Sequence, residues 1–161
     1  MFYLTILWCL NSLEVNFMKK YLLLALLLIG CGRVDPVVVD PKILPYFNRF
    51  TQATGLGTDN ISGEFTNLNF PVLGQCTVKD SYRLIQIDPT FWANADDSAK
   101  EQLVMHELGH AYLLGHNANM VSLNGIDCPA SIMYPYSFGD SICYQNNKNY
   151  YYNELHSEID S

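Results

Sequence analysis

The chain has 161 residues, 49% of them hydrophobic and only 16% charged, which is the length and composition of one globular domain. Its formal net charge of −7 reflects 16 acidic against 9 basic residues. Because no cluster of lysine and arginine is available to neutralise phosphates, the sequence excludes nucleic acid as an expected partner.

The two apolar segments near the start indicate targeting, because neither is long enough to cross a bilayer as a helix. From Met18 the chain reads MKKYLLLALLLIGCG, with two lysines, a short apolar core and then a cysteine. This segment resembles a bacterial lipoprotein signal, which is cleaved before a cysteine that then carries the lipid. The resemblance implies a signal peptide over residues 18–30 and lipid on Cys31. Since Met18 begins a complete signal, residues 1–17 are interpreted as a mis-started upstream extension.

The lipid on Cys31 would be the chain's attachment to the membrane. Gly32 stands where an inner-membrane lipoprotein of enteric bacteria has aspartate, which favours the outer membrane, on either its periplasmic or its surface face. Residues 31–41 carry two prolines and are expected to tether a folded domain over residues 42–161. The alternative is an ordinary apolar N-terminus with a chance cysteine.

Downstream patterns predict both helices and strands. Apolar residues recur at helical spacing over residues 41–55, which predicts a first helix. Short alternating apolar and β-branched runs over residues 64–88 predict strands. The Ser98–Glu101 segment has capping-box spacing and should begin a second helix. Residues 150–159 should form a final helix, with His156 on its surface.

The motif that carries the chemistry is H-E-x-x-H at His106, Glu107 and His110. On a helix, residues four apart share a face, so both imidazoles can reach one Zn²⁺ at roughly 2.0–2.1 Å. Glu107 would then lie beside the metal as general base for a water whose pKa zinc lowers to about 7. The competing interpretation is an amphipathic helix with two chance histidines. Three of the chain's 4 histidines lie between residues 106 and 116, which disfavours this interpretation.

A catalytic zinc site requires a third protein ligand. His116 lies six residues beyond the second histidine, so the helix must end in a turn before His116 can face the metal. The spacing resembles the metzincin pattern HExxHxxGxxH, in which the glycine makes this turn. Leu113 occupies the glycine position here, and a left-handed leucine costs about 1 kcal/mol or more. We therefore expect the helix to end near Leu114, capped by Gly115. Asp127 is the alternative third ligand.

The segment SIMYPY, residues 131–136, resembles the Met-turn that follows the third histidine in metzincins. The resemblance implies that Met133 forms an apolar floor under the histidines without binding zinc, a role suited to a soft thioether. It also implies that Tyr134, Pro135 and Tyr136 line the substrate pocket, with Tyr136 as a candidate donor to the oxyanion. The alternative is an apolar turn whose aromatic residues pack in the core.

With Cys9 and Cys31 outside the folded domain, three cysteines remain in it: Cys76, Cys128 and Cys143. An odd number allows one disulfide and one thiol, and an exported envelope compartment tolerates disulfides. Cys128 and Cys143 flank the Met-turn segment closely enough to staple it, but the sequence leaves the pairing open.

These motifs predict a small α+β domain of the metzincin-like zincin type, with a twisted mixed sheet, an active-site helix and a Met-turn. The expected function is a zinc-dependent endopeptidase with protein or peptide substrates, anchored by lipid in the bacterial envelope. Two alternatives stay open. One is a zinc amidase or peptidase that acts on cell-wall peptides with the same residues. The other is a non-catalytic surface lipoprotein stabilised by zinc. The intact Glu107 argues against it, because a purely structural zinc site does not need a base beside the metal.

Overall fold

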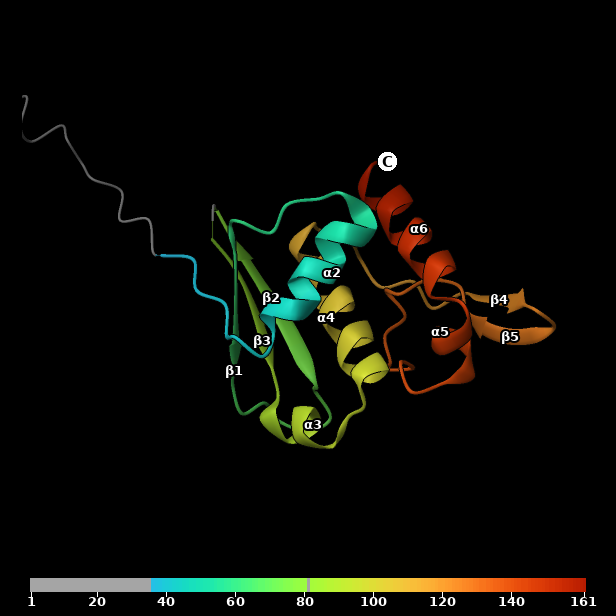
Figure 1. The fold of residues 1–161 in the computed structure, drawn as a ribbon, viewed down its shortest axis with the longest axis horizontal. Coiled ribbons are helices and arrows are strands. Elements are labelled where there is room, and N and C mark those ends of the chain that lie inside the picture. Colours follow the sequence, from blue (N-terminus) through green and yellow to red (C-terminus); the bar gives the residue numbers. More distant parts are fainter. Residues whose placement is uncertain (1–35, 81) are drawn as a thin grey trace, which may run out of the picture. The chain divides into compact units, whose positions relative to one another are not determined.

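The computed structural model describes residues 36–80 and 82–161; the predicted extension, the predicted signal peptide and the predicted lipidation site Cys31 fall outside this range. Helices and strands in this part combine into an α+β fold (Figure 1). No helix within the described residues has the length and apolar character needed to span a bilayer. The elements follow one another as α2 (Leu44–Thr54), β1 (Ile61–Phe65), β2 (Gly74–Lys79), β3 (Tyr82–Ile87), α3 (Pro89–Asn94), α4 (Asp97–Ala111), β4 (Met120–Leu123), β5 (Ile126–Pro129), α5 (Ile142–Asn146) and α6 (Lys148–Ile159).

The main sheet has the strand order β1-β3-β2, with β1 parallel and β2 antiparallel to β3. It is therefore a mixed sheet, as predicted, and β2 is an edge strand. Strands are predicted over residues 64–88, and the prediction is wrong for residues 66–73, because β2 begins only at Gly74 and the chain leaves the sheet after Phe65. In the loop that follows, Asn69 accepts a hydrogen bond from the Val72 amide across Pro71, which has no amide to donate to a ladder.

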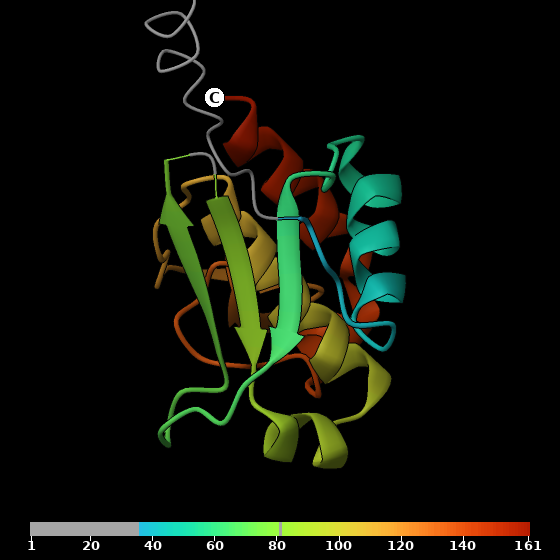
Figure 2. The same ribbon diagram turned by 90° about the vertical axis from the view of Figure 1, so that its left-hand side faces the viewer.

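Helix α4 packs on one face of the sheet against β2 and β3, and α2 packs against both α4 and α6 (Figures 1 and 2). Phe47 and Phe50 of α2 and Ile85 and Ile87 of β3 are fully or almost fully buried in the resulting core. The predicted first helix is thus present, and Gly55 ends it in a left-handed conformation with φ of 74°. The core therefore surrounds the helix that carries the histidine motif.

The start of α4 differs from the prediction. Its N-cap is Asp96, whose carboxylate accepts the Ala99 amide at 2.7 Å. Glu101 takes no part in a capping box, because it is buried and binds Arg49 and Lys148 instead. An ion pair between distant elements has replaced the local capping interaction that the sequence spacing favoured.

Part of the predicted tether is paired with the sheet. The Asp40 amide donates to Gly63 O at 2.8 Å, and the Gly63 amide donates to Val38 O at 2.9 Å. Residues 38–40 therefore run beside β1 as an extension of the folded unit, which begins at Pro36.

Candidate metal centre and its cleft

Helix α4 ends at Ala111, and the turn that follows brings the chain back toward the helix. The Leu114 amide donates to Gly109 O at 3.1 Å and the Leu113 amide to His110 O at 2.9 Å, the two bonds of a Schellman motif. Leu113 has the left-handed conformation, with φ of 69°. The expectation of a helix that ends near Leu114 with a left-handed Gly115 is therefore wrong. The hydrogen bonds fix the position of the cap, and the leucine occupies it despite its steric cost.

This turn brings the three predicted histidines together. The Nε2 atom of His110 lies 3.1 Å from that of His106 and 3.2 Å from that of His116, and the remaining pair is 3.3 Å apart. A tetrahedral zinc ion bound at about 2.0–2.1 Å places its nitrogen ligands roughly 3.3 Å from one another. The three ring nitrogens thus have the spacing of three ligands on one small ion. Among the described residues they form the one cluster of potential metal ligands, and Asp127 is outside it.

The opposite edges of two of these rings are held by backbone carbonyls. His106 Nδ1 lies 3.0 Å from Ile132 O, and His110 Nδ1 lies 2.8 Å from Leu114 O. Because a carbonyl only accepts, each Nδ1 carries the proton, which assigns the tautomer and leaves Nε2 with a free lone pair. Such contacts orient metal-binding histidines in general.

The electrostatics of the cluster favour neutral rings. Burial, together with His110 and His116, lowers the pKa of His106 to about 4. The pKa of His116 is also lowered, by burial and by His110. The Nε2 atoms of all three rings face one point, and a cation there would accept their lone pairs together. The three histidines can therefore hold a metal ion.

Glu107 is 3% exposed, and its Oε2 atom has no hydrogen-bond partner among the described residues. Burial raises the pKa of its carboxyl to about 8, and a cation on the histidines would lower that pKa again. A buried carboxylate oxygen without a partner is rare in proteins. Together with its position in the same cleft as the histidines, it gives the site a proton acceptor that is not used by the fold.

Strand β2 approaches this carboxylate closely at Gly74. A Cβ atom at this position would lie 2.7 Å from Glu107 Oε1, closer than real Cβ atoms approach a neighbour. Any larger residue at this position would force the Glu107 side chain or the strand to shift. No local pattern in the sequence indicates the contact between Gly74 and a residue 33 positions away.

The Met-turn segment lies against the same helix. Met133 is fully buried, and its sulfur contacts Gly109, where any side chain would collide with it. The Asn117 amide donates to Met133 O at 3.0 Å, which connects the turn to the residue that follows His116. Met133 thus packs against α4 at Gly109, in the helix segment between His106 and His110.

A cleft of about 720 Å³ opens over the histidines and Glu107. One wall is formed by β2 and the loop before it, and the other by residues 134–137, which include the predicted pocket residues Tyr134, Pro135 and Tyr136. Tyr136 is 72% exposed, and its ring meets that of Tyr134 edge-on at 5.8 Å. Gln102 and Ser137, which the sequence analysis did not select, also line the cleft. The three histidines, Glu107 and the predicted pocket residues therefore line one cavity.

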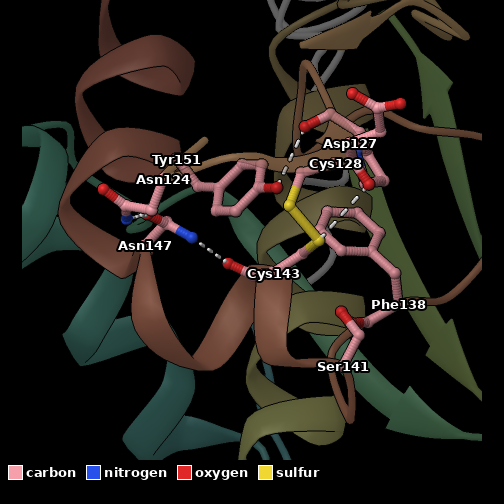
Figure 3. Close-up of a disulfide and its surroundings, with 9 residues drawn as sticks. Asn124, Asp127, Cys128, Phe138, Ser141, Cys143, Asn147 and Tyr151 are labelled. Carbon is pink, nitrogen blue, oxygen red and sulfur yellow. Dashed lines mark hydrogen bonds between the residues drawn. A yellow bond between two sulfur atoms is a disulfide. The ribbon is translucent and has the colours of Figure 1, made fainter. Parts of the chain in front are cut away.

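The disulfide joins Cys128 of β5 to Cys143 of α5 (Figure 3). This is the pairing that the flanking positions suggested, and it closes the loop that carries the Met-turn and the outer cleft wall. Asn147 donates to Cys143 O at 2.9 Å, and Tyr151 donates to Pro129 O at 2.9 Å, so α6 supports both ends. Cys76 is a free thiol on the cleft wall, and burial raises its pKa to about 11.

Most of the predicted site residues lie at this cleft. The Nε2 atoms of His106, His110 and His116 converge, Glu107 and the pocket segment line the same cleft, and Met133 packs against α4 at Gly109. Cys31 lies outside the described residues. No model of a known protein family matches this chain, and neither a curated protein nor a solved structure matches it.

Proposed function

We propose that this chain is a zinc metallopeptidase of the metzincin type, which hydrolyses peptide bonds with Glu107 as general base. The proposal is carried by one observation: three oriented imidazole nitrogens 3.1–3.3 Å apart share a cleft with a buried carboxylate oxygen that has no partner. An all-nitrogen set of three ligands suits zinc and leaves a fourth position open.

When bound, zinc would supply Lewis acidity that polarises the substrate carbonyl and acidifies a water molecule. His106, His110 and His116 hold their Nε2 atoms in position for the ion, with two of the rings fixed through Nδ1. Glu107 Oε2 takes a proton from the attacking water and returns it to the departing amine. Burial raises the pKa of this carboxyl, and the charge of a bound ion would lower it again and favour the ionised form that a base requires.

The substrate would lie between the β2 edge and the wall of Tyr134, Pro135 and Tyr136. The side chain next to the cleaved bond then enters the cavity between this wall and α4. The exposed Tyr136 hydroxyl is the candidate hydrogen-bond donor to the oxyanion. Cell-wall peptides could be cleaved by the same residues, and a substrate screen separates them from protein substrates.

A purely structural zinc site is disfavoured by Glu107. A structural site does not need a buried carboxylate, and an unpartnered carboxylate oxygen destabilises the fold because its desolvation is not compensated by a hydrogen bond. The fold would be more stable with an apolar residue there.

The test compares the wild-type chain with Glu107→Gln and His116→Ala, measuring zinc by mass spectrometry and cleavage of casein. We expect one zinc per wild-type chain and weakened zinc binding in His116→Ala. Glu107→Gln should retain zinc and lose about 10²–10⁴-fold in rate, the usual contribution of a general base. Zinc with no cleavage in the wild type, or undiminished cleavage in Glu107→Gln, would contradict the proposal.

We also propose that lipid on Cys31 anchors the protein in the bacterial envelope, because the signal-like segment from Met18 ends at this cysteine. The test is metabolic labelling with a radioactive fatty acid, followed by fractionation. Cys31→Ala should abolish labelling and move the protein to the soluble fraction, whereas Cys76→Ala should change neither. Labelling of the Cys31→Ala chain would exclude this anchor.

A further inference from the structure

A second cleft, of about 730 Å³, adjoins the one over the histidines. The two share Val72, Leu73 and Ser137 as lining residues. The second cleft continues along the loop before β2, past α3 and the first turn of α4, and reaches Asp140. An extended peptide advances about 3.3 Å per residue, so a bound chain of several residues would pass from one cleft into the other.

The second cleft has an apolar rim. Phe70 lines it and is 93% exposed, the highest value among the large hydrophobic side chains of the described residues. Val72, at the junction of the two clefts, is exposed as well. These side chains can pack against an apolar group of a bound peptide without rearrangement of the fold.

Its charge is entirely negative. Asp88, Asp96 and Asp140 line the cleft, and neither cleft has a lysine or arginine in its lining. Asp88 and Asp96 cap α3 and α4, and hydrogen bonds from the Leu68 and Phe91 amides lower the pKa of Asp88. Lys100 on the neighbouring helix turn lies over the Trp92 ring, 5.4 Å from its centroid.

Of these three aspartates, Asp140 is the one whose side chain does not cap a helix. Its side chain is exposed, and the described residues offer its carboxylate no hydrogen bond or ion pair. It is therefore free to bind a cation on a ligand. An exposed ion pair contributes little by itself, but three aspartates and no opposing charge give the cleft a directional preference.

We propose that the second cleft binds a basic segment of the substrate, with an apolar side chain against Phe70 and Val72 and a lysine or arginine near Asp140. This inference rests on the proposed peptidase function and names its substrate class: polypeptides with basic and apolar residues a few positions to one side of the cleaved bond. Acidic segments would be rejected at the same place.

The experiment measures peptide binding separately from hydrolysis. Two fluorescein-labelled peptides, identical except that two lysines in one are glutamines in the other, are titrated with the full chain carrying Glu107→Gln and zinc. Fluorescence anisotropy gives each Kd. We expect the lysine peptide to bind roughly fivefold more tightly at low salt, the upper range of an exposed ion pair. The difference should disappear near 0.5 M salt, because exposed charges are then screened.

Three further variants locate the effect. Asp140→Asn should remove most of the preference for the lysine peptide. Phe70→Ser should raise the Kd of both peptides by the same factor. Asp160→Asn, the matched control, removes one negative charge from the surface of the chain's last residues, outside both clefts. It should leave the preference unchanged.

Equal Kd values for the two peptides would overturn the proposal. So would an equal effect of Asp140→Asn and Asp160→Asn, since the net charge would then explain the preference. If Phe70→Ser altered the sedimentation coefficient while no preference was found, the cleft would bind a second copy of the chain instead. If the lysine peptide bound more tightly but the wild type hydrolysed nothing, the proposed peptidase function would be wrong and the basic-segment site would stand. If the wild type hydrolysed peptides but showed no lysine preference, the peptidase function would stand and the basic-segment site would be wrong.

Discussion

At the scale of single residues, the contact between Gly74 and Glu107 controls the position of the proposed base. Gly74→Ala would place a methyl group 2.7 Å from Glu107 Oε1 and push the carboxylate or the strand aside. Displacing the general base in this way costs on the order of 10²-fold in rate. We expect kcat/KM to fall by about that factor with zinc content unchanged, because the histidines do not contact Gly74.

Gly57→Ala is the control for this substitution. A Cβ atom at Gly57 would meet only Asp59 Oδ2, at 3.9 Å, and φ of Gly57 is not positive. Its kcat/KM should equal that of the wild type. Full activity of Gly74→Ala would mean that Glu107 or β2 can move without consequence.

The residues of the metal cluster were predictable from the sequence, because a helix fixes the distance between positions four apart. His106, Glu107 and His110 needed no tertiary information. The surroundings of Glu107 did, since Gly74 reaches it from another strand. Tertiary contacts of this kind leave no local spacing to detect.

At the scale of elements, the left-handed Leu113 ends α4 with stored strain. Its side chain is 74% exposed, so replacing it removes little packing. Leu113→Gly should relieve most of the 1–2 kcal/mol cost of a left-handed residue, less the greater entropy of glycine in the unfolded chain. We expect the free energy of unfolding, measured with urea, to rise by about 1 kcal/mol. Leu113→Ala keeps the strain and should show no gain; a less stable Leu113→Gly would mean that the leucine side chain packs after all.

Glu101 connects three helices, because Arg49 of α2 and Lys148 of α6 both bind its carboxylate within α4. Burial opposes its ionisation, but hydrogen bonds from Tyr152 and Lys148, with Arg49, lower its pKa below the usual 4.5. A lowered pKa in the folded state stabilises the fold above the unfolded pKa. This contribution should be complete at pH 7 and be lost as the pH falls below about 4.5.

Glu101→Gln measures this contribution. The variant should lose about 1.5–3 kcal/mol of unfolding free energy at pH 7, the range for hydrogen bonds to charged groups, and the deficit should shrink at pH 3. Glu64→Gln, at an exposed position of β1, should change stability by less than about 0.5 kcal/mol at either pH. A deficit independent of pH would assign the loss to packing.

Of the long helices, α2 was predictable from periodicity, because its buried residues recur at helical spacing. Helix α4 is buried on nearly every side, so its prediction depended on local motifs instead. The short helices α3 and α5 and the hairpin β4–β5 are too brief for periodicity and depend on tertiary packing. Local signals existed: Asp88 caps α3 before Pro89, and Asn124 and Gly125 both take positive φ at the hairpin tip, as an Asn-Gly turn does.

At the scale of the whole molecule, the disulfide between Cys128 and Cys143 stabilises the half of the cleft that has little secondary structure. A closed loop of about 15 residues contributes roughly 3 kcal/mol. The double variant Cys128→Ser, Cys143→Ser should therefore unfold roughly 10 °C lower in a thermal scan. Dithiothreitol should lower the Tm of the wild type by a similar amount and that of Cys76→Ser equally. A Tm unaffected by reductant would show that the bridge does not constrain the unfolded chain.

The loop that this bridge closes supplies Met133, the wall of residues 134–137 and Asp140. A newly made chain in a reducing cytoplasm would lack this covalent constraint, and its loop would be held only by packing and hydrogen bonds, such as the one from the Asn117 amide to Met133 O. In an oxidising compartment the bridge could form and hold this loop in place. The proposed peptidase, if exported as proposed, would therefore have its most rigid cleft only after export.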